Sequence, residues 1–168
     1  VDVFHDVVMR RVPALVSCLL VALIVAVVFS RGVTTGHLSM DDWGYIYGCF
    51  YVRDGLSVQN AIDAFCVVGY DAFWMPLTYL SYMVDISIFG GNVENPVWKA
   101  HHAVNVGLHT INALLVMALV RAVLGRLFNR ISSCALLGGA AVATLFWALH
   151  PMRAESVTYV ASRKELLW

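Results

Sequence analysis

Three long runs of uncharged, mostly apolar residues divide this chain, at residues 12–30, 100–120 and 131–149. A helix needs about 20 apolar residues to cross a hydrocarbon core of ~30 Å, so each run predicts a transmembrane helix. Arg10 and Arg11 precede the first run, as they would in a signal peptide. The run is longer than a usual signal core and lacks a small-residue cleavage site, so we interpret it as a retained anchor.

The stretches between these runs carry the charges and turn residues, which makes their sidedness predictable. Arg10 and Arg11 precede the first run, and three arginines lie in residues 121–130, whereas residues 31–99 hold three basic residues against seven acids. Because positive charge is retained in the cytoplasm, residues 1–11 and 121–130 are predicted to be cytoplasmic. Residues 31–99 and 150–168 are then external loops, and we expect the second of these to continue in a longer protein.

The composition agrees with a membrane protein. Of the 168 residues, 60% are hydrophobic and only 13% are charged, against about 25% charged in soluble domains. The formal net charge is zero, so no basic surface points to nucleic acid as a partner. The predicted fold class is an all-α, multi-pass membrane protein that contacts the lipid bilayer.

The first external loop is predicted to contain helices. Ser57 is suited to cap a helix that follows it, and Pro76 is suited to begin another, which Gly90 ends. This second helix has an apolar face and, opposite it, a polar face that includes Asp85, so we expect an amphipathic helix at the membrane interface. Cys49 and Cys66 fall in the same loop, and the sequence leaves open whether they pair or stay free thiols.

A polar stripe marks the second apolar run. His101, Asn105, His109 and Asn112 recur at helical spacing and share one narrow arc of the helix. Polar groups are costly in lipid, so the stripe should face protein or water. Two interpretations stay open: hydrogen bonding between helices, or the lining of a substrate cavity by His101, Asn105 and His109.

Two groups of charged residues fall on the predicted external side. Asp41 and Asp42 follow the first run, and one carboxylate of such a pair is suited to act as a general base. The third run is followed by a charged cluster that contains His150, Arg153, Glu155, Arg163 and Lys164. Its cations could hold a phosphate, and a carboxylate beside them could serve as a general base. The alternative is that both groups are only solvated helix ends.

These motifs occur in a recognisable order: "MDDWGYIY", "FWMPLTYLSYMVDISIFGGN", "HHAVNVGLHTINALLV" and "LFWALHPMRAESVTYVASRKELL". The order resembles the N-terminal region of the transmembrane and tetratricopeptide-repeat O-mannosyltransferase-like proteins and their bacterial relatives. These proteins are similar to the wider GT-C superfamily of lipid-sugar-dependent glycosyltransferases. The resemblance implies N-terminal transmembrane helices of GT-C type, with a helical external loop, in a bacterial inner membrane or the endoplasmic reticulum.

The resemblance also implies an activity and its residues. A sugar similar to mannose would pass from a polyprenyl- or dolichyl-phosphate donor to a hydroxyl acceptor on a protein or glycan. Asp41 would be the catalytic base and Asp42 its supporting acid, while His150, Arg153 and Glu155, with Arg163 and Lys164, would bind the lipid phosphate. No cofactor is clearly implied, and a divalent metal is left open. The alternatives are a fragment of a transporter, which the polar stripe would suit, and a non-catalytic membrane scaffold.

Overall fold

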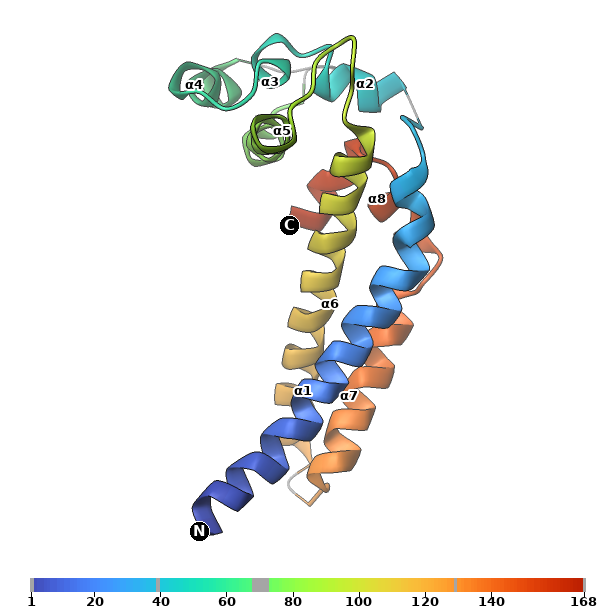
Figure 1. Cartoon of the computed structure of the whole chain (residues 1–168). Coiled ribbons are helices and arrows are strands. Elements are labelled where there is room, and N and C mark those ends of the chain that lie inside the picture. Colours follow the sequence, from blue (N-terminus) through green and yellow to red (C-terminus); the bar gives the residue numbers. More distant parts are fainter. Residues whose placement is uncertain (1, 39, 68–72, 129, 168) are drawn as a thin grey trace. The chain divides into compact units, whose positions relative to one another are not determined.

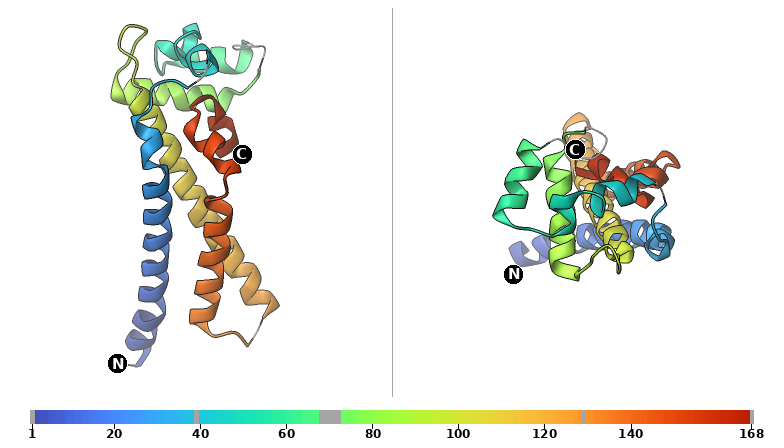
Figure 2. Two further views of the ribbon diagram at one scale, coloured as in Figure 1. Left: turned by 90° about the vertical axis from the view of Figure 1, so that its right-hand side faces the viewer. Right: turned by 90° about the horizontal axis from the view of Figure 1, so that it is seen from above.

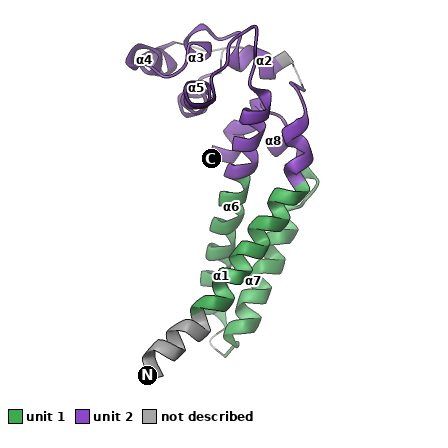
Figure 3. Ribbon diagram, viewed as in Figure 1, with its two compact units in different colours: residues 1–28, 109–153 green, residues 29–108, 154–168 purple. Residues whose placement is uncertain are grey.

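The computed structural model describes residues 2–38, 40–67, 73–128 and 130–167 (Figure 1). Across these residues the chain forms helices and no strand, which confirms the predicted all-α class. The chain divides into two compact units, coloured separately in Figure 3. Unit 1 comprises residues 1–28 and 109–153, and unit 2 comprises residues 29–108 and 154–168.

Unit 1 is built from three long helical segments. They are most of α1 (Asp2–Phe29), the second part of α6 (Trp98–Leu127), and α7 (Ser133–Ala148). Ser132 caps α7, its hydroxyl accepting a hydrogen bond from the Ala135 backbone N–H. The buried side chains recur every three or four residues, as expected for helices that each turn one face inward; they are Val21, Val25, His109, Ala113, Met117, Leu137, Ala140, Thr144 and Ala148.

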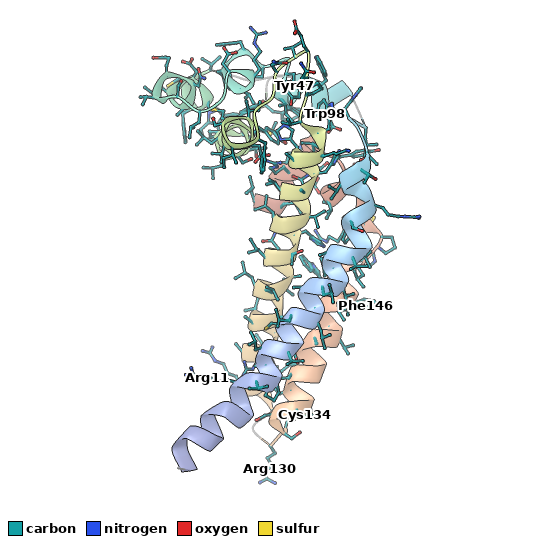
Figure 4. The ribbon with its side chains drawn as sticks, in the orientation of Figure 1. Arg11, Tyr47, Trp98, Arg130, Cys134 and Phe146 are labelled. Carbon is teal, nitrogen blue, oxygen red and sulfur yellow. The ribbon has the colours of Figure 1, made fainter. Side chains whose placement is uncertain are left out.

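The outer faces of these helices are apolar, the reverse of a water-soluble bundle. Leu15, Leu19 and Leu115 are each about 60% exposed, and Phe146 is 79% exposed; Figure 4 labels Phe146 on α7. Large contiguous apolar surfaces are not stable in water, whereas lipid tails would cover them at no cost. The exposed face of unit 1 is therefore suited to a bilayer.

Two helical segments of the described chain are long and apolar enough to cross a membrane, Arg11–Thr34 and Trp98–Leu127. They contain the predicted spans at 12–30 and 100–120. The second helix does not end at residue 120, because arginines at the membrane margin are compatible with helix and continue it through most of the predicted link. α7 has only 16 residues, and it meets the same test only when joined to α8 (Met152–Thr158). The third span and the sidedness of the loops stay predictions.

Two arginines of unit 1 lie at the same end of it. Figure 4 places Arg11, on α1, and Arg130, between α6 and α7, at the same end of this unit, near Cys134 in the first turn of α7. This grouping is what the positive-inside rule requires of residues predicted to share the cytoplasmic side.

Unit 2 contains the predicted first external loop, which is helical as expected. Its elements are η1 (Ser30–Thr34), α2 (Met40–Ile46), α3 (Phe50–Arg53), α4 (Val58–Cys66), α5 (Pro76–Phe89), the start of α6, most of α8, η3 (Ala161–Arg163) and α9 (Lys164–Leu167). The expected cap is confirmed, since the Ser57 hydroxyl accepts a hydrogen bond from the Asn60 backbone N–H at 3.0 Å. Pro76 begins α5, and Gly90 ends it at φ 65°, a left-handed value that favours glycine.

Aromatic rings fill the interior of unit 2, mainly those of Tyr45, Tyr47, Tyr51, Tyr79, Tyr82 and Trp98. The Tyr47 and Trp98 rings, labelled in Figure 4, meet edge to face with centroids 5.2 Å apart. The Tyr47 hydroxyl also accepts a hydrogen bond from the Val97 backbone N–H at 2.7 Å. These contacts fix the residue that follows α2 against the start of α6.

The two faces of α5 are distinct, as predicted, and the structure shows where each one points. Leu77 and Ile88, on the apolar face, are mostly exposed, whereas Thr78, Tyr82 and Asp85, on the polar face, are buried. The polar face therefore packs inside unit 2 rather than facing water. α4 lies beside α5, as both views in Figure 2 show.

Candidate functional site

The two adjacent acids of α2 have different environments. Asp41 is exposed, whereas Asp42 is completely buried. One Asp42 carboxylate oxygen accepts a hydrogen bond from the Leu38 backbone N–H, and the other accepts one from the Ala161 backbone N–H, both at 2.8 Å. Asp42 is therefore an anchor between α2 and the turn that precedes Arg163, and Asp41 is the acid that solvent can reach.

Arg163 lies at the centre of a buried polar network and has no exposed surface. Its Nη1 atom is 2.7 Å from Asp85 Oδ2 and 3.3 Å from the Ser81 hydroxyl. Its Nε donates to Asn105 Oδ1 at 2.7 Å, and its Nη2 donates to the His101 carbonyl at 2.9 Å. All three guanidinium nitrogens thus have acceptors within unit 2, so the phosphate-binding hypothesis depends on the other cations.

Tyr82 supports the same network from α5. Its hydroxyl donates to the Val160 carbonyl at 2.6 Å. The Arg163 Cζ atom lies over the Tyr82 ring, 4.6 Å from the ring centroid. Burial raises the pKa of the Tyr82 hydroxyl well above its ordinary value, so the group stays protonated and continues to donate. The Tyr82 hydroxyl thereby holds the backbone before Arg163.

His101 joins the network through Asp85. Its Nδ1 donates to Asp85 Oδ2 at 2.8 Å. Nε2 is buried and has no hydrogen-bond partner among the described residues. The surrounding rings are those of Tyr47, Tyr82 and Trp98, with centroids 6.1–6.2 Å from the imidazole.

The polar stripe on α6 faces protein over most of its length. The Asn105 amide donates to the Tyr159 carbonyl at 3.1 Å, in addition to accepting from Arg163. In unit 1, His109 Nε2 donates to the Ala148 carbonyl at 3.0 Å, and its ring stacks on Trp147. Hydrogen bonding between segments therefore accounts for the stripe, and the cavity-lining role of His101, Asn105 and His109 stays a prediction.

The predicted phosphate-binding cluster is divided between the two units. His150 and Arg153 belong to unit 1; His150 is exposed, and the Arg153 guanidinium lies 4.7 Å from the Trp147 ring centroid. Glu155 and Lys164 belong to unit 2, where Glu155 is exposed and Lys164 is half-buried. Within unit 2, Lys164 is the cation of the cluster that a ligand can reach.

The helix that begins at Lys164 also contributes Leu167 to the lining of an apolar pocket. The pocket has a volume of about 260 Å³ and is lined by Phe65, Trp74, Met75, Pro76, Leu77, Thr78 and Leu167. Lys164 and Leu167 are three residues apart on α9, which places them on the same side of that helix. The Lys164 ammonium also lies 5.1 Å from the centroid of the Phe73 ring. A ligand with an apolar chain and an anionic group would satisfy both features.

A larger cavity, of about 580 Å³, lies between the end of η1 and the start of α6. It is lined by Thr34, Thr35, Gly36, Phe89, Pro96, Val97, Trp98, Lys99 and Ala100. Among the described residues that line it, Lys99 alone is charged, and none of them is an acid or cation that the sequence analysis selected. Its size alone gives no chemistry, so the smaller pocket beside Lys164 is the better candidate.

Cysteines can form a disulfide, and clustered cysteines or acids can bind a metal ion. The four cysteines are free; Cys49 is buried and Cys66 is exposed. Burial raises the pKa of the Cys49 thiol, which keeps it protonated and unreactive at neutral pH. Over the described ranges, no three His, Cys, Asp or Glu side chains come together as a metal-binding group. Since both Asp42 oxygens accept from backbone amides, the acid pair is a poor metal ligand.

Sequence reasoning missed Asp85 as the partner of Arg163 and the apolar pocket beside Lys164. The signal for Asp85 was present, because a single charge on an otherwise apolar helix needs a partner.

Comparisons of the chain with protein-family models, curated proteins and solved structures found no match.

Proposed function

We propose that this chain is part of a membrane glycosyltransferase whose sugar donor is carried on a polyprenyl phosphate. Asp41 takes the proton of the acceptor hydroxyl, and Lys164 with the neighbouring apolar pocket binds the lipid phosphate. The sequence resemblance suggests this chemistry, and the mannose-like sugar and the protein or glycan acceptor come from that resemblance alone.

The observation that carries the proposal is the hydrogen bond between Asp42 and the Ala161 backbone N–H, at 2.8 Å. These residues are 119 positions apart in the chain, yet the bond joins α2 directly to the turn before α9. Asp41 precedes one end of the bond, and Lys164 follows the other by three residues. The solvent-exposed acid and the accessible cation are therefore held on adjoining segments of one unit.

These groups support an inverting displacement. The Asp41 carboxylate removes the hydroxyl proton as the acceptor oxygen attacks the anomeric carbon of the sugar. The bond from that carbon to the phosphate oxygen breaks, and its electron pair leaves with the polyprenyl phosphate. The Lys164 ammonium stabilises the negative charge that develops on the phosphate, as a cation placed near a leaving group does. The pocket's apolar lining suits the first isoprene units of the lipid.

The test is transfer of sugar from polyprenyl-phosphate mannose to a hydroxyl acceptor, with the full-length protein in lipid. Asp41→Asn should lower kcat by about 10²–10⁴-fold, because the amide cannot accept the proton. Lys164→Met should raise KM for the lipid donor. Glu94→Gln, which changes an exposed acid away from the site, is the matched control and should leave both constants unchanged. Full activity of Asp41→Asn would overturn the assignment of the base.

A further inference from the structure

The outward face of α4 is apolar, and nothing in the described chain covers it. Val58, Ile62 and Phe65 are 80%, 50% and 49% exposed. At ~100° per residue these three side chains fall within a narrow arc of the helix. The only buried residue of α4 is Ala64, which lies outside that arc. An amphipathic helix on a water-soluble domain would turn this arc inward.

The arc continues onto the start of α5. One shallow apolar depression is lined by Val58, Ile62 and Phe65 together with Ala61 and Cys66, and Phe65 also lines the pocket that Trp74 and Leu77 share. Trp74 is 64% exposed and Leu77 is 59% exposed. We call these five residues, Val58, Ile62, Phe65, Trp74 and Leu77, the platform surface; Figure 2 shows α4 and α5, which carry most of it, side by side.

The chemistry of the platform surface fits the interface of a lipid bilayer. Its five side chains are uncharged, and two polar residues of α4, Gln59 and Asp63, hydrogen-bond to each other on another side of the helix. The Trp74 indole N–H donates to the Phe65 carbonyl at 3.0 Å, so the indole needs no hydrogen bond to water. Trp is favoured at membrane interfaces. Lys164, near Phe73 at the border, supplies the positive charge that anionic head groups attract.

The chain itself indicates why the occupant is lipid. Trp98–Leu127 is long and apolar enough to cross a membrane, and its first residues, up to Leu108, belong to the same unit as α4 and α5. Where that helix enters a bilayer, unit 2 must lie at the bilayer surface. We infer that the platform surface inserts into the outer part of the lipid layer, so that α4 lies flat in the membrane interface. This inference depends on α6 crossing the membrane and not on sugar transfer.

The experiment uses an environment-sensitive fluorophore attached to a single cysteine in the full-length protein, in a background without the four native cysteines. Ile62→Cys places the fluorophore on the platform surface, and Gln59→Cys, on the polar side of the same helix, is the matched control. Both proteins are reconstituted in phosphatidylcholine vesicles, with part of the lipid brominated near the head-group end of its acyl chains. Iodide in the water is the second quencher. Val58→Cys repeats the first label if Ile62→Cys lowers the unfolding temperature.

We expect brominated lipid to quench most of the fluorescence at residue 62 and little at residue 59, with iodide giving the reverse order. Equal quenching of both positions by iodide would overturn the inference, because it would show the platform surface in water. Shielding of residue 62 from both quenchers would also overturn it, because a protein surface would then be the occupant.

Discussion

Replacing Asp85 with Asn would leave the Arg163 guanidinium buried without its carboxylate. The pair is 2.7 Å apart, Arg163 has no exposed side-chain surface, and Asp85 has 5%. Removing one partner of a buried ion pair typically costs about 3–5 kcal/mol, because the remaining charge keeps its desolvation penalty. Asn retains one acceptor oxygen, so we expect a loss near the lower limit, about 3 kcal/mol.

The measurement is thermal unfolding of the purified protein in lipid nanodiscs. For a chain of this length, a loss of about 3 kcal/mol corresponds to a fall in Tm of about 6–12 °C. Asp54→Asn is the matched control, since Asp54 pairs with Arg53 at 3.7 Å and both side chains are well exposed. Exposed pairs contribute about 1 kcal/mol or less, so this variant should unfold near the wild-type temperature.

A second variant separates the buried charge from general damage to packing. Asp85→Leu combined with Arg163→Met removes both charges and keeps apolar volume. If the uncompensated guanidinium is the cause, the double variant should recover much of the stability that Asp85→Asn loses. A Tm for Asp85→Asn equal to that of Asp54→Asn would refute the account of this network as a buried ion pair.

Two further predictions concern accessibility. A membrane-impermeant thiol reagent added to intact cells should label Glu94→Cys and not Gly125→Cys in a cysteine-free background, because residues 31–99 are predicted to be external and residues 121–130 cytoplasmic; the reverse pattern would invert the topology. In the otherwise native protein a maleimide should modify the exposed Cys66. The buried Cys49 should react only after unfolding, because burial also raises the pKa of its thiol. Rapid modification of Cys49 in the folded protein would contradict its burial.

Those parts of the fold that depend on residues close together in the sequence were predictable. Hydropathy over about 20 residues indicates a helix that lipid can surround, and it located Arg11–Thr34 and Trp98–Leu127. Local hydrogen-bonding chemistry located the Ser57 cap and the Gly90 terminus of α5. Helical periodicity also separated the two faces of α5, because a fixed rotation per residue sorts side chains without any knowledge of the partner.

The sequence could not show which distant residues each helix face packs against. Asp41 and Asp42 are adjacent and chemically equal, and the structure distinguishes them because the backbone N–H groups of Leu38 and Ala161 bind Asp42 and leave Asp41 in solvent. Arg163 and Asp85 are likewise 78 residues apart, so no local pattern joins them. Periodicity gave the polar face of α5 without showing that an arginine covers it. Hydropathy likewise did not show that the third apolar run forms a helix of 16 residues, shorter than the about 20 that a span needs.

The buried network and the proposed site are connected through a single peptide bond. Arg163 and Lys164 are consecutive, yet the first is completely buried and the second is half-exposed. Hydrogen bonds from Arg163 to Asn105 and His101, and its ion pair with Asp85, fix the end of η3. Since α9 begins at the next residue, the direction of the Lys164 side chain follows from the position of Arg163. Of these two candidates for the phosphate, Arg163 is thus used for positioning, and Lys164 is the one to which the proposed function gives the binding role.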